Sequence, residues 1–191
     1  MVKSMNTIIG VSNRHVHLQE KIWKQLFGDE EMIKRNDLGQ PGQFATTSTV
    51  DIMYNGHIIE HVRVIGPLRP YNQIEISKTD AETLGVNPPR RQSGDLEGSL
   101  PITLIGPQGQ VDLESGLILA EMHLHMEPSM ANSLNIKDKE IFPVYQNDKY
   151  LFDVKVKISN PGALELHIDT DESTYYNLKT GSEVEVKICG K

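Results

Sequence analysis

The most constraining feature of this sequence is a His-x-His motif that occurs twice, at His15–His17 and at His123–His125. On a β-strand, residues i and i+2 point to the same face, so each motif places two imidazoles side by side. Such a pair can supply two ligands to a metal ion, although a single copy is more often an exposed or hydrogen-bonded pair at a strand end. Two copies in a chain with seven histidines favour metal binding.

The segments that follow the two motifs are also alike, which indicates an internal duplication. Each motif is followed by a candidate helix, and later by a short strand that leads into a Thr-Asp pair. Aligning the copies pairs Glu75 with His167, with one gap before the Thr-Asp pair. We therefore expect two related halves, in which Glu75 completes a His-His-Glu set and His167 completes a His-His-His set.

The chemistry of these sets is limited by the cysteine content. Cys189 is the only cysteine, which excludes an intramolecular disulfide and a zinc site built mainly from thiolates. Three protein ligands with an open fourth position are typical of catalytic zinc, but the same donors also suit Mn, Fe or Co. His57 and His61 have no counterpart in the repeat, and we expect them at the surface.

The net charge of the chain limits the classes of molecule that it is expected to bind. With 26 acidic and 19 basic side chains the net charge is −7, which disfavours nucleic acid and anionic membranes. No apolar run approaches the about 18 residues of a membrane span, so we expect a cytoplasmic protein. Arg69, six residues before Glu75, is a candidate to hold an anionic substrate beside the metal. The alternative for Arg69 is a surface ion pair.

Short apolar runs with turn signals between them predict a mainly β chain with few helices, arranged as one or two small barrels. Asn55-Gly56 predicts a hairpin. A helix is expected over 18–27 with Gly28 as its C-cap, and shorter helices after Thr79 and Thr170 as N-caps. A further short helix is expected over 128–134 and a loop over 87–99. Strands are expected at 7–11, 50–54, 57–64, 74–76, 102–105, 110–113, 117–125, 149–158, 164–168 and 183–188.

Six motifs, in order and from about residue 8 to about residue 175, resemble the PduL-type phosphate acyltransferase family. That family includes the phosphate propanoyltransferase, a phosphotransacylase, of bacterial microcompartments. The motifs are Gly10–Leu18, Gln40–Phe44, Gly66–Arg69, Glu75–Asp80, His123–Met126 and His167–Glu172. The resemblance implies interconversion of a short-chain acyl-CoA plus phosphate and an acyl phosphate plus CoA. It also implies two small pseudo-symmetric β-barrels with short capping helices and an active site between them.

The resemblance further implies a discontinuous barrel domain of residues 7–46 and 121–191, whose first strand joins the C-terminal part, and a second barrel of residues 47–120. It implies two zinc ions. One would be held by His15, His17 and Glu75, and the other by His123, His125 and His167. Arg69 would be the catalytic arginine that holds phosphate. CoA contacts would be made by Ser12, Arg63 and His167.

Several expectations concern mechanism and location. We expect phosphate to attack the acyl group directly, without a covalent acyl-enzyme, because the only thiol is the third residue from the end of the sequence. Microcompartment members carry an N-terminal packaging helix. Only seven residues precede Ile8 here, which favours a free cytoplasmic enzyme over shell association in a microcompartment. The sequence leaves the acyl chain length, the direction of flux and the presence of a homo-oligomer open.

Two other functions are compatible with the same residues. A dinuclear metallohydrolase would use these ligands and the arginine on an ester, amide or phosphate, with water in place of phosphate as the nucleophile. A non-catalytic, metal-stabilised binding module would close each metal with four protein ligands. Dependence of the reaction on phosphate separates the transferase from the hydrolase.

Overall fold

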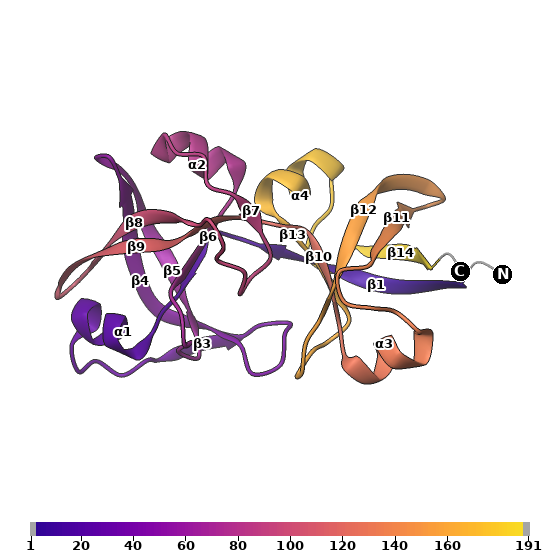
Figure 1. Ribbon diagram of the computed structural model, residues 1–191, viewed down its shortest axis with the longest axis horizontal. Coiled ribbons are helices and arrows are strands. Elements are labelled where there is room, and N and C mark those ends of the chain that lie inside the picture. Colours follow the sequence, from indigo (N-terminus) through magenta and orange to yellow (C-terminus); the bar gives the residue numbers. More distant parts are fainter. Residues whose placement is uncertain (1–2, 189–191) are drawn as a thin grey trace. The chain divides into compact units, whose positions relative to one another are not determined.

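The computed structural model describes residues 3–188, which form two compact units (Figure 1). Unit 1 contains residues 3–12, 39–41 and 122–188, and unit 2 contains Asn13–Leu38 and Gly42–Glu121. Each unit has its own hydrophobic core, and no residue is shared between the two core clusters of the described chain. Cys189 lies outside the described residues.

Unit 1 is a closed six-stranded barrel with the strand order β1-β13-β10-β12-β11-β14, accompanied by helices α3 and α4. Its core includes Leu124, Val156 and Leu166, all fully buried. Its elements are β1 (Lys3–Ser12), β10 (His123–Met126), α3 (Pro128–Leu134), β11 (Ile141–Gln146), β12 (Lys149–Ile158), β13 (Glu165–Asp169), α4 (Thr170–Tyr176) and β14 (Glu183–Ile188).

Unit 2 also closes through six strands, β4-β5-β2-β6-β9-β8, because β8 pairs with both β9 and β4. Two short strands are added outside this ring, β3 beside β4 and β7 beside β9. Its elements are β2 (His15–His17), α1 (Glu20–Phe27), β3 (Lys34–Asp37), β4 (Phe44–Tyr54), β5 (His57–Gly66), β6 (Gln73–Ile76), α2 (Lys78–Leu84), β7 (Arg90–Arg91), β8 (Leu100–Gly106) and β9 (Gly109–Ala120). The predicted mainly β fold with two small barrels and short helices is confirmed.

The two barrels repeat one topology. Strand β10 pairs antiparallel with β13 and parallel with β12, just as β2 pairs antiparallel with β6 and parallel with β5. The parallel pair β1–β13 likewise corresponds to the parallel pair β9–β6. In each case the strand that precedes the His-x-His motif in the chain belongs to the barrel of the other unit. The two motifs therefore lie in equivalent supersecondary units.

The unit boundaries differ from the expected 7–46 and 47–120. Residues Asn13–Leu38 and the chain from Gly42 belong to unit 2, and only Gly39–Pro41 of this stretch belongs to unit 1. The reason is strand pairing and packing. Strand β2 pairs with β5 and β6, and α1 packs against β8 and β9 through an apolar face that includes Trp23 and Leu26.

Local signals explain both the correct elements and the missed ones. Asn55 and Gly56 have φ angles of 48° and 84°, as a two-residue hairpin between β4 and β5 requires. The predicted strand over 117–125 is instead two strands, because β9 ends at Ala120 and β10 begins at His123 in the other barrel. Strands β3, β7 and β11 were not predicted. All four residues of β3 are exposed, so no buried alternation marks it.

Helix α2 begins two residues earlier than expected, and α4 begins one residue earlier. Ser77, not Thr79, caps α2, and Asp169, not Thr170, caps α4. In both cases the side chain of the cap accepts a hydrogen bond from the backbone N–H three residues on, and the acidic side chain of that residue accepts one from the backbone N–H of the cap. Gly28 follows α1 as predicted, with a φ of 66°.

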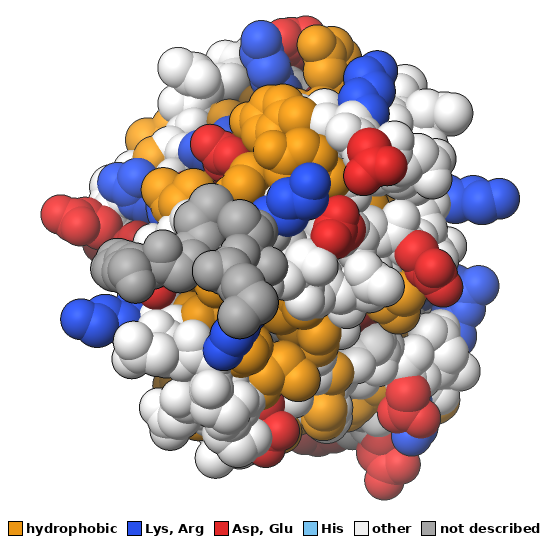
Figure 2. Space-filling view, turned by 90° about the vertical axis from the view of Figure 1, so that its right-hand side faces the viewer, with side chains coloured by type: hydrophobic (Ala, Val, Ile, Leu, Met, Phe, Trp, Pro, Cys, Tyr) orange, Lys and Arg blue, Asp and Glu red, His pale blue; other side chains and the backbone are white. Residues whose placement is uncertain are grey.

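The described helices and surface bear on possible partners. Among residues 3–188, no helix is long and apolar enough to cross a membrane. Figure 2 shows one face of the molecule, on which lysine and arginine side chains alternate with acidic and hydrophobic ones. The described side chains of this face therefore carry charges of both signs, without a continuous basic patch.

Candidate functional site

The first triad lies in unit 2 and consists of His15 and His17 on β2 and Glu75 on β6. His15 and Glu75 are directly opposite in the antiparallel β2–β6 pair, with His15 Nε2 3.6 Å from Glu75 Oε1. His15 Nδ1 lies 2.8 Å from the carbonyl oxygen of Asn13. If Nδ1 donates to this carbonyl, the lone pair of Nε2 is left facing the carboxylate. His17 and Glu75 are 3% and 6% exposed, so the triad is buried.

The two histidines of the first triad have pKa values shifted in opposite directions. Burial lowers the pKa of His17 to about 3, with help from the charges of His15 and Arg69. His17 is therefore neutral near pH 7, as a metal ligand must be. Burial opposes protonation of His15 too, but the charge and hydrogen bond of Glu75 outweigh it and raise the pKa of His15. Without a metal, the carboxylate thus favours the protonated form of His15.

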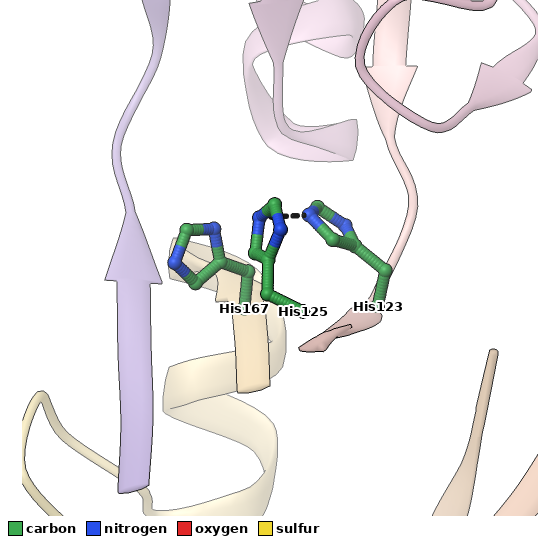
Figure 3. Close-up of side chains that lie close together, drawn as sticks. All are labelled: His123, His125 and His167. Carbon is green, nitrogen blue, oxygen red and sulfur yellow. Dashed lines mark hydrogen bonds between the residues drawn. The ribbon is translucent and has the colours of Figure 1, made fainter. Parts of the chain in front are cut away.

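The second triad lies in unit 1 and consists of His123 and His125 on β10 and His167 on β13. His123 and His167 are directly opposite in the antiparallel β10–β13 pair, which repeats the register of His15 and Glu75. The Nε2 atoms of His123 and His125 are 2.9 Å apart, and the ring centroids of His125 and His167 are 4.6 Å apart. Figure 3 shows the three imidazoles side by side, with one ring nitrogen of His167 directed toward His125.

Both triads fit a divalent metal ion. In each, one donor atom per residue lies within 4.8 Å of the other two. The donors are imidazole nitrogens and one carboxylate, which suit zinc and neighbouring divalent metals. Grouping three imidazoles in a largely buried site, with nitrogen facing nitrogen, is poorly explained by hydrogen bonding alone. The chain therefore offers two clusters compatible with two metal ions.

Arg69 lies beside the first triad. Its backbone N–H donates to the carbonyl of Leu18 at 2.8 Å, which fixes the segment after β5 against the chain that follows β2. The positive charge of Arg69 disfavours protonation of His15 and His17. Its effect on their pKa values is smaller than the effects of burial and of the charges within the triad. Its Nε atom is buried and has no hydrogen-bond partner among the described residues. A buried charged donor without a partner is a ready site for an anion.

The remaining residues considered from the sequence lie on strands β1 and β5, outside both triads. Arg63 lies on β5 opposite His15, and its guanidinium donates to the carbonyls of Thr46 and Thr47 at 3.2 and 2.8 Å. Ser12 ends β1 in unit 1, paired with Asp169 of β13. His57 and His61 are exposed on β5 and belong to neither triad.

Two buried polar residues were missed at the sequence level. Gln73 stands two positions before Glu75, and its amide donates to the Glu75 carboxylate at 2.5 Å. Glu165 stands two positions before His167, with Oε2 2.9 Å from His167 Nε2. The hydrogen bond with His167 lowers the pKa of Glu165. The signal was available, because residues i−2 and i of a strand share a face.

Comparison with known proteins identifies the family of this chain. The sequence profile of the phosphate propanoyltransferase family matches residues 8–190. The chain belongs to this family. Among curated members, it is 46% identical to the phosphate propanoyltransferase of Thermotoga maritima over 187 residues, covering 95% of this chain and 89% of the relative. It is 40% identical to that of Lachnoclostridium phytofermentans, covering 93% and 85%, and 40% identical to that of Salmonella typhimurium, covering 86% and 80%.

Membership in the phosphate propanoyltransferase family confirms two expectations from the sequence. The resemblance to phosphate acyltransferases is correct, and the chain is an enzyme of the acyltransferase class. The match also runs across both units, so the family spans both barrels and both triads.

Proposed function

We propose that this enzyme transfers a short acyl group between CoA and phosphate, with both triads loaded with divalent metal, zinc first among the candidates. In the direction of acyl phosphate formation, the carbon–sulfur bond of the thioester breaks, a carbon–oxygen bond to phosphate forms, and CoA leaves with the electron pair of the broken bond. Metal held at the triads supplies a Lewis acid for the thioester carbonyl and for the departing thiolate. Family membership and the names of the relatives support the reaction.

The observation that carries the mechanism is the buried Nε of Arg69, which has no partner among the described residues beside the first triad. A guanidinium offers two parallel donors that match two oxygens of phosphate. Arg69 would hold the phosphate against the acyl carbon and balance the negative charge that grows in the tetrahedral transition state. Because its charge already faces the triad, little reorganisation accompanies the reaction.

The CoA contacts are proposed at Ser12, Arg63 and His167. Of the second triad, His167 keeps the most side-chain exposure, at 24%, which allows contact with substrate. Arg63 is only partly buried, and its contacts with two backbone carbonyls leave further N–H groups for a phosphate of CoA.

Phosphate dependence tests the proposed reaction. Purified metal-loaded protein should release CoA from propanoyl-CoA only when phosphate is added, and each CoA released should be matched by one acyl phosphate. Equal CoA release with and without phosphate, and no acyl phosphate, would identify a hydrolase instead. No CoA release under either condition would point to a binding module.

Direct attack by phosphate makes a further prediction about the only thiol. Cys189→Ala should keep phosphate-dependent turnover within about twofold of the parent, because no covalent acyl-enzyme is formed. The measurement is the same CoA-release assay, with thermal unfolding as the control for folding. A folded variant that has lost turnover would show that Cys189 carries the acyl group.

A further inference from the structure

Glu165 is a buried carboxylate at the second triad that the proposed reaction does not use. It lies on β13 directly opposite His125 of β10 and two positions before His167, so it shares the face of the strand that carries the triad. Its side chain is nearly inaccessible, with the residue 8% exposed. Its Oε2 atom is 2.9 Å from His167 Nε2 and accepts a hydrogen bond from Gln40 Nε2 at 3.1 Å.

The Glu165 carboxylate is held at Oε2 by Gln40 and His167 and lies against two glycines. Gln40 is itself fixed by two hydrogen bonds with the backbone of Ala163, at 3.2 and 3.3 Å. Gly10 and Gly39 lie directly against the carboxylate group of Glu165. A Cβ on Gly10 would lie 2.7 Å from Glu165 Oε1 and 2.9 Å from His167 Cδ2, so only glycine allows this approach. Residues 39–41 belong to unit 1, although the chain before and after them belongs to unit 2. Their place in unit 1 is explained by the contacts of Gly39 and Gln40 with Glu165.

The first triad has a counterpart at the same position. Gln73 lies opposite His17 and two positions before Glu75, as Glu165 lies opposite His125 and two positions before His167. The Gln73 amide donates to Glu75 at 2.5 Å and also joins Ser93 and Gly94 of the following loop. The type of neighbour differs with the proposed ligand. The carboxylate of Glu75 has the amide donor of Gln73 beside it. The imidazole of His167 has the carboxylate acceptor of Glu165 beside it.

We infer that Glu165 is a positioning residue that fixes the tautomer and orientation of His167 for metal binding, with Gln40 as its clamp. Figure 3 shows one ring nitrogen of His167 directed toward His125 and the other directed away from the two histidines of β10. With the proton of Nε2 on the side of Glu165, the lone pair of Nδ1 is free for the metal. Partners of this kind typically strengthen metal binding about 10–100-fold. The inference rests on the proposed metal-loaded enzyme.

The test uses metal affinity and not turnover. Zinc competition with a chelator should give two affinities for the parent protein. In Glu165→Gln, which keeps the shape and removes the charge, one affinity should fall about 10–100-fold and the other should stay unchanged. Gln40→Ala should weaken the same affinity to a smaller degree, since it frees the carboxylate without removing it. Glu183→Ala, an exposed carboxylate on β14 of the same barrel, is the control and should change neither affinity.

Saturation with Co²⁺ separates positioning from ligation. If Glu165 only orients His167, the visible spectrum of the fully loaded Glu165→Gln variant should match that of the parent. A changed spectrum at saturation would make Glu165 a direct ligand and overturn the inference. Unchanged affinities in Glu165→Gln, with unfolding of the metal-free variant shifted instead, would show a purely structural role. A parent that binds no second metal ion would overturn the proposed metal function itself.

Discussion

Arg69→Ala should lose at least about 100–1,000-fold in phosphate-dependent turnover while it keeps both metal ions. The variant removes the guanidinium whose buried Nε has no partner among the described residues, and with it the proposed hold on phosphate. The metal should stay, because Arg69 is in neither triad and its charge disfavours protonation of the histidines without binding the ion. The measurement is kcat and KM for phosphate together with metal content.

Two further variants serve as controls for the loss of turnover in Arg69→Ala. Arg69→Lys keeps the charge but not the paired donors, so it should recover only part of the turnover. Arg35→Ala, on the exposed strand β3, should behave like the parent. Loss of metal in Arg69→Ala would assign Arg69 a structural role, and unchanged turnover would place the phosphate elsewhere.

His125→Ala should halve the metal content, from two ions per chain to one, and reduce turnover to background. His125 is 6% exposed between His123 and His167, and two remaining ligands hold a divalent metal poorly. The first triad is built entirely from residues of unit 2, so its metal should remain. Metal analysis after dialysis and the CoA-release assay measure the two effects.

His57→Ala is the matched control for His125→Ala. His57 is an exposed histidine on β5 outside both triads, and its loss should change neither metal content nor turnover. Loss of both metal ions in His125→Ala would show that the triads do not bind independently. Full turnover with one metal ion would show that the second triad is not needed for the reaction.

The triads could be predicted from the sequence because the ligands follow from the repeat and from strand periodicity. The alternation within His15–His17 and the pairing of Glu75 with His167 need only the sequence, and the register of β2–β6 and β10–β13 then brings the donors together. The unit boundaries could not be predicted, because they depend on pairing between strands that are far apart in the sequence. The boundary near Ser12 was missed because the segment after β1 was expected to stay in the same domain, whereas β2 pairs with β5 and β6 of unit 2.

The supporting residues were hidden for a different reason. Gln40 lies in a turn motif, and nothing local shows that its amide is buried against Glu165, 125 positions later in the chain. Exposed strands such as β3 carry no hydrophobic alternation, so the periodicity that predicted β5 and β12 had nothing to act on there. Ligands marked by the repeat were predictable even across two strands, whereas partners from segments without a repeated pattern, such as Gln40, were not.

The central claim is that two metal-loaded triads serve one phosphate-dependent acyl transfer, and reconstitution of metal-free protein tests it most directly. Zinc would be added in steps, with bound metal and CoA release from propanoyl-CoA measured on the same samples, with and without phosphate. The account predicts no turnover without metal, full turnover only when two ions are bound per chain, and no release without phosphate. Full turnover of the metal-free protein, or release independent of phosphate, would contradict it.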